Sequence, residues 1–300
     1  MTHLVLHVGA HGTDGGRIAG WLARNRSVLE GQGLALPAPG LFLRRISEAL
    51  DLGRDEDPAT REAALIDSLG AGGKRLVVSA PGLLGGSADA LASDGFYRRD
   101  VARRLYGLQM LFGHSRVTVL LAVASAAQVI PALLPDEPGA AEALMEAVGD
   151  ETLPWARLAQ SIRTQLPRAD LLVWRHEDLP RVWPQVLGAL VGPGVVLPPA
   201  GLLDIAASTL GAEARLRLQR YLGANPPASA RHLRDIIEAF ARRFGRATEG
   251  DAAAQALPAW LRSRLAGLDQ GYATEWGDLA GLKGVRTLTG HDTPDPRVTD

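Results

Sequence analysis

The residues best suited to chemistry lie near the amino terminus, between positions 4 and 18. The apolar run Leu4–Val8 predicts a buried strand, and a helical pattern begins at Ile18. A loop that joins the carboxyl end of a strand to the amino end of a helix offers backbone N–H groups and the positive end of the helix dipole to an anion. This loop is rich in glycine, so the sequence predicts a phosphate-binding loop. Its candidate ligands are Gly9, Gly12, Thr13, Gly15, Gly16 and Arg17.

The side chains of this loop differ from those that usually hold a phosphate. The loop contains no lysine, and it carries one carboxylate, Asp14. Two like unit charges about 4 Å apart repel by roughly 4 kcal/mol at an effective dielectric constant of 20. An inward-facing Asp14 is therefore expected to oppose phosphate binding. Arg17 could replace the missing lysine through bidentate hydrogen bonds, or it could be a solvated residue of the first helical turn.

Several histidines are candidates for chemistry. His11 could be a general base, because the pKa of histidine lies close to neutrality, or it could only shape the loop. The even spacing of His3, His7 and His11 suggests a metal site. However, the first two would lie roughly 13 Å apart along a strand, so no metal is expected. The cluster at 176–178, His-Glu-Asp, could be catalytic or could be a strand-end turn that caps the next helix.

The elements that must position these residues alternate between strand and helix. Short runs rich in Val and Leu predict strands at Leu4–Val8, Arg75–Ser79, Val117–Val123 and Leu171–Trp174. Helical patterns occur at Ile18–Glu30, Pro58–Leu69, Arg98–Phe112 and Glu151–Gln165. The alternation predicts a three-layer α/β/α fold with a mainly parallel sheet. In such folds ligands bind outside the carboxyl ends of the strands, where residues 9–17 would lie.

The pattern changes at about residue 200. We expect an α/β core over 1–200, a helical extension of the same domain over 201–290, and a loose polar tail over 291–300. The helices expected in the extension are Ala212–Leu222, Ala230–Phe244 and Pro258–Tyr272. Their Ala-, Leu- and Arg-rich surfaces leave room for a homodimer.

Composition excludes several classes of function. The formal net charge is −1, and the aromatic residues are not interleaved with basic ones, so nucleic acid is not an expected partner. The chain has no cysteine, which removes disulfides and thiolate chemistry. It shows no signal peptide and no apolar run long enough to span a membrane, so a cytoplasmic protein is expected.

The first loop resembles that of the sulfotransferase family, in particular bacterial members that read roughly His-Ile-Gly-Thr-His-Lys-Thr-Gly-Thr-Thr-Ser before a helix ending in Asn-Arg. The matching residues are His7, Gly9, His11, Thr13, Asn25 and Arg26. Later segments, including Asp170–Leu190 and Tyr272–Leu279, are also similar, so the resemblance covers most of the chain in order. It implies a fold of the P-loop NTPase type and transfer of a sulfuryl group from PAPS (3′-phosphoadenosine 5′-phosphosulfate) to an acceptor that the sequence does not identify.

This chain departs from the family at the positions that would grip PAPS. The lysine and two hydroxyl residues that hold the 5′-phosphosulfate in the family correspond to Gly12, Gly15 and Gly16. In the second segment, the Arg and Ser that hold the 3′-phosphate in the family correspond to Ala124 and Ala132, and the candidate ligand there is the neighbouring Ser125. Losing one stabilising donor costs about 10²–10³ in rate. Two hypotheses follow: a sulfotransferase in which Arg17 and backbone amides replace the lost groups, or a non-catalytic binding or assembly protein. An ordinary P-loop NTPase is disfavoured, because no Gly-Lys-Ser/Thr motif is present.

Overall fold

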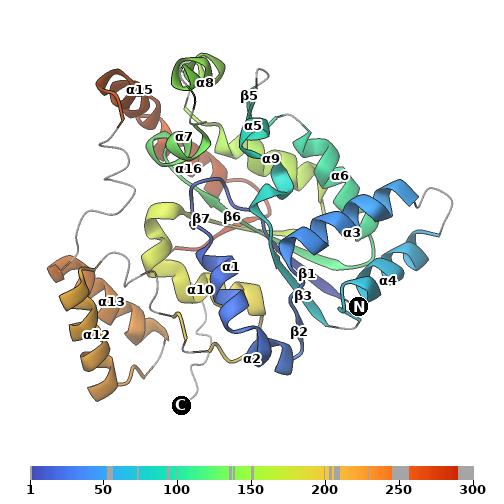
Figure 1. Cartoon of the computed structure of the whole chain (residues 1–300), viewed down its shortest axis with the longest axis horizontal. Coiled ribbons are helices and arrows are strands. Elements are labelled where there is room, and N and C mark those ends of the chain that lie inside the picture. Colours follow the sequence, from blue (N-terminus) through green and yellow to red (C-terminus); the bar gives the residue numbers. More distant parts are fainter. Residues whose placement is uncertain are drawn as a thin grey trace.

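A six-stranded parallel sheet forms the centre of the computed structural model (Figure 1). The model describes residues 2–52, 57–72, 74–92, 95–98, 100–134, 137, 139–149, 152–198, 200–202, 205, 210–228, 230–244 and 257–289. The strand order is β2-β3-β1-β6-β7-β8, and every neighbouring pair is parallel. The strands are β1 (His3–His7), β2 (Leu34–Ala35), β3 (Arg75–Ser79), β6 (Arg116–Val123), β7 (Asp170–Arg175) and β8 (Val285–Thr287). The four strands expected from the sequence are confirmed.

Helices cover both faces of this sheet, as Figure 1 shows. One face carries α1 (Arg17–Arg24), α2 (Arg26–Gly31) and α10 (Leu179–Val191). The other face carries α3 (Pro39–Leu52), α4 (Pro58–Ser68), α6 (Val101–Leu111), α7 (Ala126–Leu133), α8 (Ala140–Val148), α9 (Trp155–Gln165), α15 (Ala259–Asp269) and α16 (Tyr272–Ala280). Short elements complete this side: η1 (Pro81–Leu84), α5 (Ser87–Ala90), β4 (Leu91–Ala92) and β5 (Gly95–Phe96).

The four long strands β1, β3, β6 and β7 are buried on both faces, which is why they read as continuous apolar runs. In β1, Leu4 and Leu6 point into one core and Val5 into the other. The same alternation in β7 sends Val173 to the first core and Trp174 to the second. The three-layer α/β/α fold expected from the sequence is therefore confirmed.

Some expected helix boundaries are wrong. The segment Ile18–Glu30 is two helices, because the chain leaves helical geometry at Asn25 (φ −101°, ψ 10°). The amide of Asn25 donates to the carbonyl of Trp21 at 2.9 Å, a local bond that competes with helix continuation. The third helix begins at Val101 rather than at residue 98, since Asp100 is left-handed with φ 59°.

Two other helical segments also differ from expectation. The helix expected over Glu151–Gln165 begins at Trp155, directly after Pro154. The helix expected over Pro258–Tyr272 is α15, which begins at Ala259 directly after Pro258 and ends at Asp269, and Tyr272 begins the next helix, α16. A proline is favoured immediately before a helix or in its first turn, which explains both starting points.

Beyond about residue 200 the described residues are mainly helical, as expected, although β8 adds a strand to the sheet. Beyond α10, the helices α12 (Ala212–Ala224) and α13 (Ala230–Phe244) pack on each other through small cores of their own. The second of them contacts α10, and the pair lies to one side of the sheet in Figure 1. The tail expected at 291–300 lies outside the described residues. Within the described part of the chain, no helix combines the length and apolarity needed to cross a membrane.

A half-buried histidine, His3, links three strands at the amino edge of the sheet. Arg75 donates from Nη1 to Nδ1 of His3 at 2.8 Å, and His3 Nε2 lies 2.8 Å from the hydroxyl of Thr118. The same guanidinium donates to the carbonyls of Ala189 and Leu190 at the end of α10. Burial and the charge of Arg75 lower the pKa of His3 from 6.5 to about 4. The neutral ring is therefore the form that fits this network.

We expect the free energy of unfolding to fall as the pH drops from about 6.5 to about 4, because in this window His3 binds a proton in the unfolded chain but not in the folded one. His3→Gln keeps an acceptor for Arg75 and a donor for Thr118 without titrating. Urea unfolding at pH 7 and pH 5 measures the effect. The variant should lose less stability between these pH values than the wild type, and equal losses would contradict the assignment.

Candidate functional site

The glycine-rich loop lies at the carboxyl edge of the sheet, after its central strand β1 and before α1. Its first residues continue the strand pairing, since Val8 and Ala10 donate their N–H groups to the carbonyls of Leu120 and Ala122, both at 3.0 Å. The chain then turns through left-handed residues at Gly12, Gly15 and Gly16, with φ between 58° and 75°. These values favour glycine and explain why the segment contains so many.

The carboxylate of Asp14 occupies the amino terminus of α1. Its two oxygens accept hydrogen bonds from the backbone N–H groups of Gly16 at 3.2 Å and Ile18 at 2.9 Å. The side chain is only 4% exposed. These N–H groups are the ones that a phosphate would use in a loop of this kind. The anion at this helix terminus is therefore part of the chain itself.

The position that would carry a lysine in the resembled family has no room for a side chain. A Cβ atom on Gly12 would lie 2.7 Å from Cβ of Ala132 and 3.0 Å from the carbonyl oxygen of Gln128, both on α7. The amide of Gln128 also donates to the carbonyl of Gly12 at 2.7 Å. The loop is thus fastened onto α7, and a lysine at this position would require that helix to move.

The remaining candidate residues of the loop differ in how accessible they are to solvent. The hydroxyl of Thr13 donates to the carbonyl of Ala10 at 2.7 Å and is buried, so it serves the loop's own turn. In contrast, Gly15 and Gly16 are exposed. Arg17 is half-buried beside them, with Nη1 3.4 Å from the carbonyl oxygen of Asp14. The accessible part of the loop is therefore Gly15, Gly16 and this guanidinium.

His11 is held by a buried tyrosine that the sequence did not reveal. The hydroxyl of Tyr97 accepts from the backbone N–H of His11 at 3.0 Å and lies 2.6 Å from Nδ1 of the same residue. When the hydroxyl donates to Nδ1, the neutral ring carries its proton on Nε2. Burial lowers the pKa of His11 and raises the pKa of Tyr97. In this tautomer the ring offers a hydrogen-bond donor, and a role as general base would require the proton to move.

Two further histidines lie close enough to Asp14 to feel its charge. His7 is fully buried, stacks on Trp174 with ring centroids 6.0 Å apart, and places Nδ1 2.8 Å from the hydroxyl of Ser79. Burial lowers the pKa of His7, and Asp14 opposes that shift. For His176, burial and the charge of Arg17 lower the pKa, again opposed by Asp14. Both rings are therefore neutral near pH 7.

A second carboxylate covers the amino terminus of α7, directly after Ser125. Asp269, the last residue of α15, accepts from the backbone N–H groups of Ala126 at 2.5 Å and Ala127 at 3.2 Å. Burial raises the pKa of Asp269, and these two hydrogen bonds oppose the shift. The side chain of Ser125 forms no capping hydrogen bond. The terminus expected to help bind a 3′-phosphate thus already holds an acidic group.

A third helix shows the same arrangement. Glu275 of α16 accepts from the backbone N–H of Ala156 at 3.0 Å, in the first turn of α9. This helix also starts beside the end of β6, because the indole of Trp155 donates to the carbonyl of Ala124 at 2.9 Å. Three helix amino termini around one end of the sheet, those of α1, α7 and α9, are therefore occupied by carboxylates of the chain.

The remaining sequence candidates lie elsewhere or serve the fold. The cluster at 176–178 is the short turn η2 (His176–Asp178) at the end of β7, where Asp178 accepts from Arg175 at 2.8 Å. The strand-end turn is confirmed, but its side chains do not cap α10. His3 lies at the opposite end of β1 from the loop. Among the described residues, no three His, Cys, Asp or Glu side chains gather in a way that could hold a metal ion.

No protein-family model, curated protein or solved structure matches this chain. The resemblance to sulfotransferases therefore stays a prediction from the sequence, and the functional argument depends on the geometry of the loop.

We expect Asp14→Ala to lower the free energy of unfolding by about 1–2 kcal/mol, because it leaves two N–H groups at the start of α1 without their acceptor. Asp57→Ala is the matched control. Asp57 caps α4 through the N–H of Thr60 at an exposed site, so a smaller loss is expected there. Urea unfolding measures both values. A loss at Asp14 no greater than the loss at Asp57 would show that the buried cap is not needed.

Proposed function

We propose that this protein is a non-catalytic, sulfotransferase-like binding protein whose donor site is closed by its own side chains. The observation that carries the proposal is the Asp14 carboxylate at the amino terminus of α1, bonded to Gly16 and Ile18. A donor phosphate would have to displace this carboxylate or approach it closely. At an effective dielectric constant of 20, the repulsion at about 4 Å is roughly 4 kcal/mol.

The surroundings of the loop support the same proposal. Sulfuryl transfer requires cationic or hydrogen-bonding groups that stabilise charge on the departing phosphate. Here Gly12 is packed against α7, the hydroxyl of Thr13 is used within the loop, and Asp269 covers the start of α7. Each of these contacts uses a group, or fills a space, that a bound nucleotide would need. The same contacts make the loop a rigid part of the scaffold.

A PAPS-dependent sulfotransferase is the second candidate, and Arg17 favours it. Its guanidinium lies beside the exposed residues Gly15 and Gly16, and no atom lies within 4 Å of the space that a side chain on Gly16 would occupy. In this alternative, Arg17 and the amides of those two glycines would hold the 5′-phosphosulfate. His11 would then face the acceptor, a small molecule or protein that the structure does not identify.

Thermal unfolding with adenosine 3′,5′-bisphosphate separates the two candidates. A ligand at about 100 times its dissociation constant stabilises the folded state by about 2.7 kcal/mol. We expect no shift in Tm for the wild type at millimolar ligand. Asp14→Ser removes the charge and retains a capping oxygen, so it should gain a positive shift.

Arg17→Ala completes this test. In the Asp14→Ser background it should abolish the gained shift, because Arg17 is then the cation nearest the exposed glycines. A wild-type shift that Arg17→Ala removes would overturn the non-catalytic proposal in favour of the enzyme. No shift in Asp14→Ser would show that the carboxylate is not what closes the site.

A further inference from the structure

The charges of this nearly neutral chain are separated into two surfaces. Helices α12 and α13 together contain seven arginines against three carboxylates, whereas the whole chain has a formal net charge of −1. The remainder of the chain is therefore net acidic. The clearest acidic stretch is residues 117–156, which contain six carboxylates and no lysine or arginine.

The acidic surface is centred on α8. Glu142 and Glu146 lie one turn apart on this helix and are exposed, and Glu137 is exposed just before it. None of the three forms an ion pair with another described residue. Like charges four residues apart destabilise a helix by about 0.2–0.5 kcal/mol. This spacing therefore does not serve the stability of α8.

The basic surface lies on the hairpin formed by α12 and α13. The exposed arginines include Arg217 and Arg220 on the first helix and Arg243 on the second. Apolar side chains lie among them: Leu216 is 54% exposed and Tyr221 is 42% exposed. Exposed apolar groups set among mainly basic side chains are typical of a protein interface.

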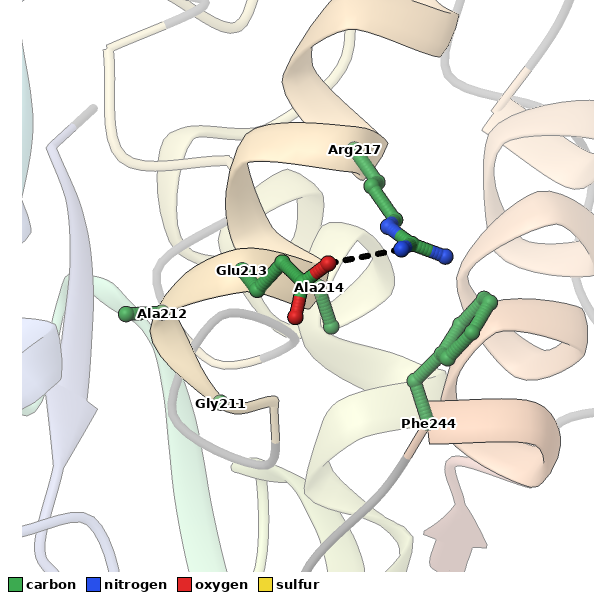
Figure 2. Close-up of a pocket in the computed structure, with 6 residues that line it drawn as sticks. All are labelled: Gly211, Ala212, Glu213, Ala214, Arg217 and Phe244. Atoms are coloured by element: carbon green, nitrogen blue, oxygen red, sulfur yellow. Dashed lines mark hydrogen bonds and ion pairs between the residues drawn. The ribbon is translucent and has the colours of Figure 1, made fainter.

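A pocket of about 460 Å³ opens at the end of this hairpin (Figure 2). It is lined by Gly211, Ala212, Glu213, Ala214, Arg217 and Phe244. The guanidinium of Arg217 lies 5.5 Å from the ring centroid of Phe244, and its partner Glu213 is 2.6 Å away. The pocket thus offers an aromatic wall and a cation to a side chain from another molecule.

We infer that the hairpin of one copy docks on the acidic α8 surface of a second copy, and that two such contacts form a symmetric dimer. In Figure 1 α8 lies at the top of the molecule and the hairpin at the lower left, so the two surfaces do not meet within one copy. A twofold axis pairs each surface with its complement in the partner, which closes the assembly at two copies. Opposite charges on one chain favour this partner over an unrelated acidic protein or a polyanion. The inference stands whether or not the loop binds a nucleotide.

Charge reversal tests the dimer on the full chain. Arg217→Glu, Arg220→Glu and Arg243→Glu together leave the hairpin with four arginines against six carboxylates, so it becomes net acidic. Glu142→Arg with Glu146→Arg makes α8 basic. We expect the wild type to sediment as a dimer in about 0.01 M salt and to dissociate in about 1 M salt, where the Debye length falls from about 30 Å to about 3 Å. Each reversed variant alone should weaken the dimer by about tenfold or more.

Mixing the two reversed variants is the decisive measurement. In the mixed pair an acidic hairpin faces a basic α8, and a basic hairpin faces an acidic α8, so equal amounts should form a heterodimer. Glu30→Arg with Glu48→Arg, at an exposed residue of α2 and a partly exposed residue of α3, is the control and should leave the dimer unchanged. Circular dichroism shows that each variant is folded.

Three outcomes would overturn the inference. The wild type could remain monomeric in low salt at concentrations near 0.1 mM, roughly 100-fold above a micromolar dissociation constant. A dimer could survive both reversals. Finally, the wild-type hairpin could bind heparin while the protein stays monomeric, which would assign the basic surface to a polyanion.

Discussion

The first turn of an α-helix presents backbone N–H groups that have no partner inside the helix. In this protein α1, α7 and α9 all start around the carboxyl end of the sheet, where an external anion could satisfy them. Instead Asp14, Asp269 and Glu275 accept these bonds. Much of the molecule depends on these internal carboxylates. Asp14 occupies the start of α1 in the glycine-rich loop, and Asp269 and Glu275 fasten α15 and α16 to the rest of the fold.

Capping by Asp14 also explains why the loop is rich in glycine although it contains no lysine. Gly12 must remain small because α7 lies directly against it. Gly15 and Gly16 take left-handed geometry, which brings the backbone round to the Asp14 side chain. The connection between strand and helix therefore needs the glycine-rich backbone of an anion site for its own structure. A motif defined by glycines alone would not distinguish a loop that binds phosphate from one that binds its own carboxylate.

Sequence patterns predicted the long strands, the three layers and the position of the loop, because each depends on local composition and short-range order. They missed β2 and β8, since two or three residues are too few to show a period. An Asp shortly before a helix is a common capping signal, so the role of Asp14 could have been predicted. The contacts of Asp269 and Glu275 could not have been predicted, because the residues that they join are 143 and 119 positions apart in the sequence. Tyr97, which fixes His11, lies 86 residues from it, and its φ of 47° has no sequence signature.

The long-range caps have a consequence for how the polypeptide is made. The strand β8 completes one edge of the sheet, and α15 and α16 bury Leu261, Leu265 and Leu279 in the main core. A nascent chain still lacking residues 257–289 would leave the starts of α7 and α9 unsatisfied and this core open to water. The native core can therefore close only after residues 257–289 have been synthesised, and until then the partly folded chain exposes apolar surface that favours aggregation.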